Sequence, residues 1–287
     1  MAPTNRPQLG IDIASPVAQG FEFVSSSLAW RPQICEIDTL RGTRSHSAAC
    51  ASWAPALATG TIEMSPNAQE LARLLPWILG AEAESCVYCP TECLSNRTVT
   101  VDKVTQVSTY TGCLVGRAVF YGRQGSDLQL SIDVVGTGSV DAEPGTFPSV
   151  DHVPGTPFRF ADCEFTLLGA DYRLLEFALT IDNHLEAGFF GSPQGQLTAV
   201  DRTVRFACAC PFVPGDQSPA TVPLVGGSTS LIFSSDDSLL TFSLPTWQVP
   251  LAGPQVPARQ QSALRLNGVA RRTDTSPELV ITLENNN

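Results

Sequence analysis

The sequence is poor in the side chains that proteins commonly use to hold phosphates. Lys103 is its one lysine, it contains 3 histidines, and 28 acidic against 17 basic residues give a formal net charge of −11. A protein that grips nucleic acid through its phosphates needs clustered lysine and arginine. The composition therefore argues against a nucleic-acid-binding protein of that kind.

A long hydrophobic run is also absent. No window approaches the roughly 18 apolar residues of a membrane-spanning helix, and residues 1–20 carry prolines and polar residues where a secretory signal is continuously apolar. The 9 cysteines are an odd number in a chain of 287 residues, which is too large to depend on disulfides. We therefore expect no membrane partner, synthesis in the cytoplasm and reduced thiols.

The common catalytic and cofactor-binding motifs are missing as well. The sequence has no Gly-rich loop followed by Lys-Ser or Lys-Thr, no dinucleotide fingerprint, no Gly-x-Ser-x-Gly, no His-Glu-x-x-His and no loop with calcium-binding spacing. His46, His152 and His184 lie in loop-like segments, where polar turn histidines are the simpler interpretation. We therefore expect no enzymatic activity and no cofactor.

One group of cysteines has the spacing of metal ligands. Cys86, Cys89 and Cys93 could present three thiolates to Zn²⁺, with Cys113 or the Cys-Ala-Cys segment 208–210 completing a tetrahedral site. A structural zinc site usually has two similar knuckles, and Cys-Ala-Cys cannot form the same turn. We therefore predict no metal here, and leave open both a disulfide and ordinary buried thiols.

Residues 65–80 are expected to form the one clear helix. Ser65 suits the N-cap, Pro66 the first turn and Gly80 the C-terminal end. Pro76 is expected to kink or shorten this helix. The apolar residues recur three or four positions apart and form one face: Leu71, Leu74, Leu75 and Ile78.

Elsewhere apolar and polar residues alternate, as in strands with one buried face. In residues 128–134 the even positions are apolar, whereas Gln129, Ser131 and Asp133 belong to the other side. The 22 glycines and 22 prolines favour strands and turns over long helices. Further strands are expected at residues 61–64, 98–104, 113–121, 158–168, 174–181, 203–207, 230–233, 239–244, 263–270 and 278–283. The expected fold class is mainly β, a β-rich α+β protein with some ten strands and one helix.

Residues 136–155 combine glycines, prolines and little periodicity, which is typical of a linker. The segments on either side follow in a similar order at offsets of about 140–150 residues, which indicates a duplication. We therefore predict two tandem domains, residues 1–145 with an N-terminal arm and residues 146–287. Chance similarity between two β domains is the alternative.

Several segments occur in a distinctive order along the chain. A strand followed by a helix, residues 59–80, precedes characteristic phrases at residues 110–116, 128–136, 157–163, 177–185 and 244–247. In this order they resemble the tail tube proteins, or major tail proteins, of long-tailed, siphovirus-type bacteriophages. The resemblance covers most of residues 55–287, and the first fifty residues match poorly.

The resemblance implies a tail-tube-type β-sandwich or barrel with a flanking helix, and no active site or cofactor. Copies of the chain would close into rings that stack into a tube, with either three two-domain chains imitating six-fold symmetry or six chains per ring. DNA would pass through this tube without specific binding. Other tail proteins would be partners, and the protein would lie in the virion tail after assembly in the host cytoplasm.

If the strand at residues 128–134 belongs to the tube wall, Gln129, Ser131 and Asp133 are the candidate lumen-facing residues. A solvated outer face is the alternative, because alternation gives sidedness without direction. An acidic lumen would repel DNA phosphates, and the net charge has that sign. Two rival classes remain: another β-sandwich virion protein or adhesin-like binding module, and an enzyme that uses its cysteines, which would need a pocket and an activated thiolate.

Overall fold

The structure is a computed structural model that describes residues 7–12, 19–31, 34–36, 51–53, 56–81, 83–144, 146–147, 150, 152, 155–189, 195–211, 227–235, 238–250 and 263–285. Within these residues the chain consists of antiparallel strands, a single α-helix and a short 3-10 turn.

The elements appear in the following order along the chain. They are β1 (Gln8–Asp12), β2 (Gln19–Phe21), β3 (Ser25–Ser26), β4 (Ala29–Arg31), β5 (Ile34–Glu36), β6 (Ala51–Trp53), β7 (Leu57–Met64), α1 (Ala68–Leu79), β8 (Val87–Tyr88), β9 (Arg97–Asp102), β10 (Val107–Arg123), β11 (Gln129–Gly136), β12 (Gly138–Ala142), η2 (Phe160–Asp162), β13 (Cys163–Leu167), β14 (Ala170–Tyr172), β15 (Glu176–Asp182), β16 (Leu185–Gly188), β17 (Gln196–Ala199), β18 (Thr203–Pro211), β19 (Gly227–Ser234), β20 (Ser238–Gln248), β21 (Ala263–Ala270) and β22 (Val280–Asn285).

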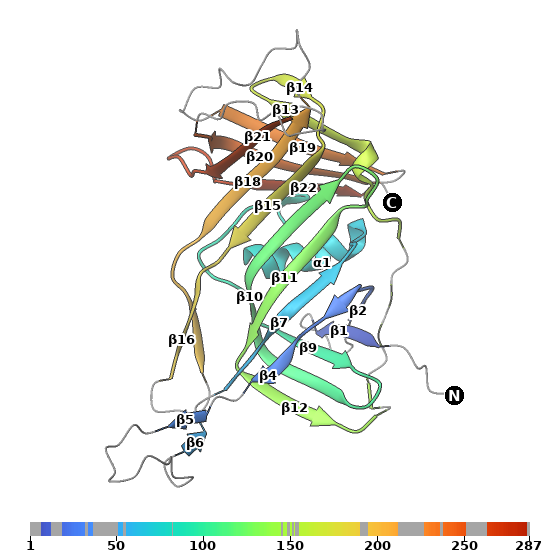
Figure 1. Cartoon of the computed structure of the whole chain (residues 1–287), viewed down its shortest axis with the longest axis vertical. Helices are drawn as coiled ribbons and strands as arrows, with labels where there is room; N and C mark the ends of the chain where they lie inside the picture. Colours follow the sequence, from blue (N-terminus) through green and yellow to red (C-terminus); the bar gives the residue numbers. More distant parts are fainter. Residues whose placement is uncertain are drawn as a thin grey trace.

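A six-stranded antiparallel sheet, in the order β7–β11–β10–β15–β18–β21, runs through the middle of the molecule (Figure 1). We call it the central sheet. β3 and β4 pair with β7 at one end, and β20 follows β21 at the other. From β20 the pairing branches to β22 and β8 and, through β19, to β13 and β14. The predicted class, mainly β with one helix, is confirmed, and among the described strands the sheet is open and does not close into a barrel.

Strand β10 is 17 residues long and belongs to two sheets. Its second half lies in the central sheet, whereas its first half pairs with β9 and β12 in a smaller sheet that β1 and β2 complete. Between the two parts Gly112 has a φ of 61°, and a Cβ there would collide with the Thr137 hydroxyl. Glycine is therefore required where the strand passes from one sheet to the other.

Helix α1 covers the apolar face of the central sheet, and its first turn differs from the prediction. Asn67 is the N-cap, not Ser65: its Oδ1 accepts from Glu70 N at 2.9 Å, and Glu70 Oε2 accepts from Asn67 N at 3.0 Å. This reciprocal capping box places Pro66 before the helix. Gly80 ends the helix in the left-handed conformation as expected, and the helix continues past Pro76 to Leu79.

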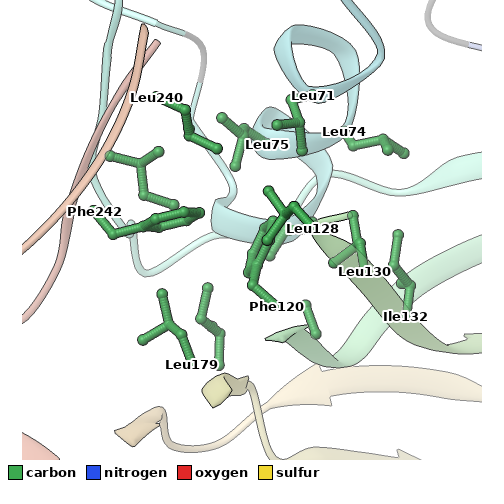
Figure 2. Close-up of a cluster of buried hydrophobic side chains, with 14 of the residues drawn as sticks. Leu71, Leu74, Leu75, Phe120, Leu128, Leu130, Ile132, Leu179, Leu240 and Phe242 are labelled. Atoms are coloured by element: carbon green, nitrogen blue, oxygen red, sulfur yellow. The ribbon is translucent and has the colours of Figure 1, made fainter. Parts of the chain in front are cut away.

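One hydrophobic core joins the helix to strands from both halves of the sequence. Figure 2 shows Leu75 of α1, Phe120 of β10 and Phe242 of β20 converging on this core, and all three are buried. The two aromatic rings lie 5.1 Å apart between centroids and are tilted by 56°. Burial of such side chains is the main favourable term in folding.

Each predicted strand position contains a strand, although residues 160–162 of the predicted strand 158–168 form the 3-10 turn η2, and two further segments were misread. The predicted linker at residues 136–155 contains β12, whose residues pair with the first half of β10. In the expected N-terminal arm, β1 pairs with β9 while β3 and β4 pair with β7, so the described part of this segment extends both sheets. The strands in these segments do not alternate between buried and exposed residues: Leu9, Gly10 and Ile11 of β1 are all buried, and the last three residues of β12 are all exposed. The division into domains at residues 1–145 and 146–287 stays a prediction.

Truncating Phe120 to alanine should destabilise the chain by about 3–5 kcal/mol, because the cavity would lie between α1 and β20 in a fully buried site. Val119→Ala on the partly exposed side of the same strand is the matched control, and it should cost less than about 1 kcal/mol. Urea unfolding measures both. Equal losses in the two variants would contradict this placement of the core.

Candidate functional site

The central sheet has a second face, turned away from the core, which we call the polar face. On β11, Leu130, Ile132 and Val134 are buried, whereas Gln129, Ser131 and Asp133 alternate with them and are partly exposed. The three candidate residues therefore share the polar face. Whether this face borders a lumen stays a prediction.

Neighbouring strands hold these polar side chains in place. Thr61 of β7 donates its hydroxyl to Asp133 Oδ1 at 2.6 Å, and Gln129 Nε2 donates to Ser65 Oγ at 2.6 Å. Ser131 lies opposite Glu63 of β7 in the strand register. The candidate residues are thus tied to the segment that precedes helix α1.

Charged residues of opposite sign face one another across the polar face. Arg117 of β10 lies directly opposite Asp133 of β11 on one side and Asp182 of β15 on the other. Residues directly opposite in antiparallel strands have Cβ atoms about 4.5–5.5 Å apart, within reach of a charge interaction. The sequence pattern of β11 indicated only Asp133 of this group. The alternation of β10 and β15 offered a signal for the other two, but their register could not be read from the sequence.

A second charged group lies six residues farther along β10. Arg123 is opposite Glu176 of β15, and Arg265 of β21 makes an ion pair with Glu176 at 2.7 Å. The two groups line different parts of the same face.

The polar face is hollowed between these strands. A concavity of about 880 Å³ is lined by residues including Tyr121, Arg123, Glu176 and Asn267. Burial raises the pKa of Tyr121, and the nearby carboxylate of Glu63 raises it further. Tyr121 therefore stays a neutral hydrogen-bonding group at neutral pH.

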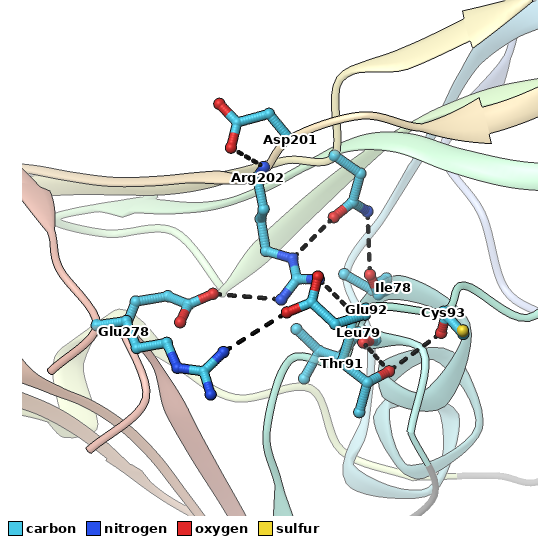
Figure 3. Close-up of polar contacts among 10 residues, drawn as sticks. Ile78, Leu79, Thr91, Glu92, Cys93, Asp201, Arg202 and Glu278 are labelled. Atoms are coloured by element: carbon cyan, nitrogen blue, oxygen red, sulfur yellow. Dashed lines mark hydrogen bonds and ion pairs between the residues drawn. The ribbon is translucent and has the colours of Figure 1, made fainter. Parts of the chain in front are cut away.

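The C-terminal end of α1 is held by a polar cluster from distant parts of the chain (Figure 3). Asn183 Nδ2 donates to the carbonyl oxygens of Ile78 at 3.2 Å and Val115 at 3.0 Å, and Thr91 N donates to Leu79 O at 2.9 Å. The last carbonyls of a helix lack partners within it. Asn183 and Thr91 supply those partners.

Arg202 completes this cluster. Its guanidinium donates to Asn183 Oδ1 at 3.4 Å, to Glu278 Oε1 at 3.2 Å and to Thr91 O. The side chains of Arg202 and Glu278 are only 14% and 17% exposed. One arginine therefore joins the loop after α1 to the loops before β18 and β22.

The predicted cysteine group shows no metal-like geometry. Cys86 and Cys93 are exposed and Cys89 is partly buried, and no three metal-ligating side chains converge within the described residues. Burial raises the pKa of the Cys113 thiol to about 12, which leaves it protonated. We still predict that the cysteine group binds no metal, which the zinc content of protein purified without added metal would test.

The two histidines within the described residues, His152 and His184, have different neighbours. His46 is outside the described residues, and His152 packs against Gly20. His184 contacts Thr203 Oγ1 at 3.1 Å and lies 3.6 Å from Asp182, but its side chain is 46% exposed. His184 N donates to Asp182 Oδ1 at 3.0 Å, so these contacts close the turn after β15.

These features define a mainly β protein in which the charged residues of the central sheet share one broad face and buried polar residues hold the end of the helix. A family model described as phage tail tube protein matches residues 36–270. The match spans most of the chain, which therefore belongs to the phage tail tube protein family. No individual curated protein matches. The helix of the described chain is too short to cross a membrane.

Membership of this family makes the protein a structural component of a phage tail. The match begins at residue 36, earlier than the segment in which the sequence resemblance was recognised. The match includes the central sheet, helix α1 and the polar cluster apart from Glu278.

Replacing Asn183 with alanine should lower the free energy of unfolding by about 2–4 kcal/mol, because buried carbonyls would lose their donor and Arg202 an acceptor. Asn267→Ala removes the same side chain from an exposed position on β21 and should change stability by less than about 0.5 kcal/mol. Chemical denaturation distinguishes the two. Similar midpoints for both variants would show that the cluster does not fasten the helix.

Proposed function

We propose that the chain assembles with copies of itself into rings, that the rings stack into a phage tail tube, and that DNA leaves the virion through this tube. Membership of the tail tube family is the observation that carries the proposal. The protein would be made and assembled in the host cytoplasm and would contact other tail proteins at the ends of the tube.

The open sheet supports assembly through strand edges. Among the described strands, β14 and β8 end the pairing on one side, and β3 and β4 end it on the other. Exposed edges carry backbone donors and acceptors that can pair with another chain. Ring closure between copies would satisfy them, whereas head-to-tail stacking of rings would continue into a filament.

We propose that the polar face, with Gln129, Ser131 and Asp133, lines the lumen. This face carries the charged residues of the central sheet and is hollowed around Val119 and Tyr121, and the opposite face is filled by the core and α1. A water-filled channel requires a polar wall, and only this side of the central sheet offers one along all six strands. DNA would pass along it without sequence-specific contacts.

We favour a ring of three chains, each contributing two tail-tube-like domains, residues 1–145 and 146–287, that imitate six-fold symmetry. A ring of six chains is the alternative arrangement of the same function. An adhesin-like binding module without tube formation is the rival function, and a polar sheet face alone is compatible with it.

The purified full-length chain should form rings or tubes in negative-stain electron micrographs and sediment as large species at high concentration. Image symmetry gives the number of chains per ring, and six chains would refute the trimer but not the tube. Sedimentation as a compact monomer at every concentration, with no rings or tubes in the micrographs, would overturn the proposed function.

Phage carrying Asp133→Arg should assemble and then eject DNA more slowly, with the delay shrinking as salt rises, because a positively charged ring attracts phosphates. The fold should tolerate the change, since Asp133 is partly exposed and the loss of its bond from Thr61 costs about 1 kcal/mol. Asp141→Arg on the exposed strand β12 is the control. Ejection at the unmodified rate from assembled Asp133→Arg particles would exclude the lumen assignment.

A further inference from the structure

The charges of the polar face are arranged in two rows that run across the strands. The first row takes one residue from each of five neighbouring strands, and each residue lies directly opposite the next. From β7 to β18 these residues are Thr61 (β7), Asp133 (β11), Arg117 (β10), Asp182 (β15) and Thr203 (β18). The single arginine of this row is therefore flanked by a carboxylate on both sides. Both carboxylates are further fixed, Asp133 by the Thr61 hydroxyl and Asp182 by the backbone of the following turn.

The second row has the opposite order of signs. Arg123 of β10 is opposite Glu176 of β15, and Glu176 pairs with Arg265 of β21 at 2.7 Å. Here one carboxylate lies between two arginines. Taken together, the two rows place three carboxylates beside three arginines.

Two further charges lie outside the rows. Glu63 of β7 is opposite Ser131 and accepts the Ser25 hydroxyl at 3.0 Å, and Arg205 of β18 lies opposite the uncharged Thr180. The strands of the central sheet thus carry four acidic and four basic residues on the polar face. The formal charge of −11 therefore comes from the rest of the chain.

We infer that the polar face is a charge-compensated surface that neither holds nor strongly repels a polyanion such as duplex DNA. A phosphate that approaches Arg117 also approaches Asp133 and Asp182, so attraction to the arginine is cancelled at close range. Affinity for DNA grows with the number of phosphates that free cations neutralise. Arginines that already have carboxylate neighbours contribute little to that number.

This inference rests on the proposed function for the identity of the polyanion, the DNA inside the tube. It also replaces the expectation, based on the net charge of the chain, that the lumen is acidic and repels DNA. An acidic wall would repel DNA with an energy that depends strongly on salt, whereas a compensated wall leaves passage almost independent of salt. The balance of acidic and basic residues on the polar face, and not the net charge of the whole chain, would determine how easily DNA slides.

The test removes the four carboxylates of the face without changing side-chain size. In the face variant, Glu63→Gln, Asp133→Asn, Glu176→Gln and Asp182→Asn uncover Arg117, Arg123 and Arg265, and Arg205 already has no carboxylate opposite it. The asparagines keep the Oδ1 acceptors used by Thr61 and by the turn at His184. The control variant changes four exposed carboxylates elsewhere and raises the net charge by the same amount: Asp141→Asn, Glu143→Gln, Glu164→Gln and Glu186→Gln. Circular dichroism establishes that each variant is folded.

Binding of a fluorescent 20-base-pair duplex to the purified full-length chains is followed by anisotropy at increasing salt. The unmodified chain and the control should not bind, whereas the face variant should bind at low salt. Its affinity should fall with a log–log salt slope of up to about −3.6, since four arginines can neutralise four phosphates and each neutralised phosphate contributes about −0.9. DNA binding by the unmodified chain, equal binding by both variants, or no binding by the folded face variant would each overturn the inference.

Electron microscopy of the same preparations separates this inference from the proposed function. Absence of rings and tubes counts against the tube, whatever the binding results. Tubes that form while the face variant gains no affinity for DNA count against charge compensation alone. The two proposals therefore fail through different measurements.

Discussion

Burial of one side of the β10–β11 hairpin beneath helix α1 constrains everything else in the structure. The apolar residues of this hairpin must face the helix, so the alternation of each strand sends Arg117, Asp133 and their neighbours to the opposite side. A slip of one residue between β10 and β11 would exchange the two sets and bury charge. The same register between β10 and β11 therefore determines both which residues pack in the core and which charges lie on the polar face.

The fold and the proposed role meet at the polar face. In the proposed tube the chain would form part of a wall, and such a wall would need a side that tolerates both water and a passing polyanion without holding it. Rows of opposed charges provide such a side while leaving the surplus of acidic residues elsewhere on the molecule. The excess of acidic residues in the rest of the chain favours solubility.

Local sequence patterns were sufficient to predict the strands and helix ends that have a clear apolar–polar alternation or a clear capping residue. Strand β21 occupies residues 263–270 as predicted, and Gly80 ends the helix because only glycine adopts its left-handed conformation at little cost. Ser65 was a false cap, because Asn67 and Glu70 together satisfy more backbone donors than Ser65 alone can. Strand β12 was missed because glycine and exposed residues hide its pairing with β10.

The site was only partly predictable for a different reason. Asp133 could be placed on the polar side from its own strand, but its neighbours Arg117 and Asp182 come from other strands. Their juxtaposition depends on long-range register, which no local pattern contains. The same holds for the cluster at the end of α1, where Asn183 lies 105 residues beyond the Ile78 carbonyl that it binds.

The passage of β10 through two sheets has a mechanical consequence. A force applied to the small sheet of β1, β2, β9 and β12 reaches the central sheet along the covalent backbone of β10, through the bend at Gly112. Strand β12 of the small sheet is joined to β11 through Thr137, so the same force also pulls β11. The hydrogen bonds from β10 to β15 and from β11 to β7 therefore carry the load together. Hydrogen bonds that carry a load together resist extension better than bonds that open one after another. The two sheets are therefore expected to resist a pulling force as one mechanical unit.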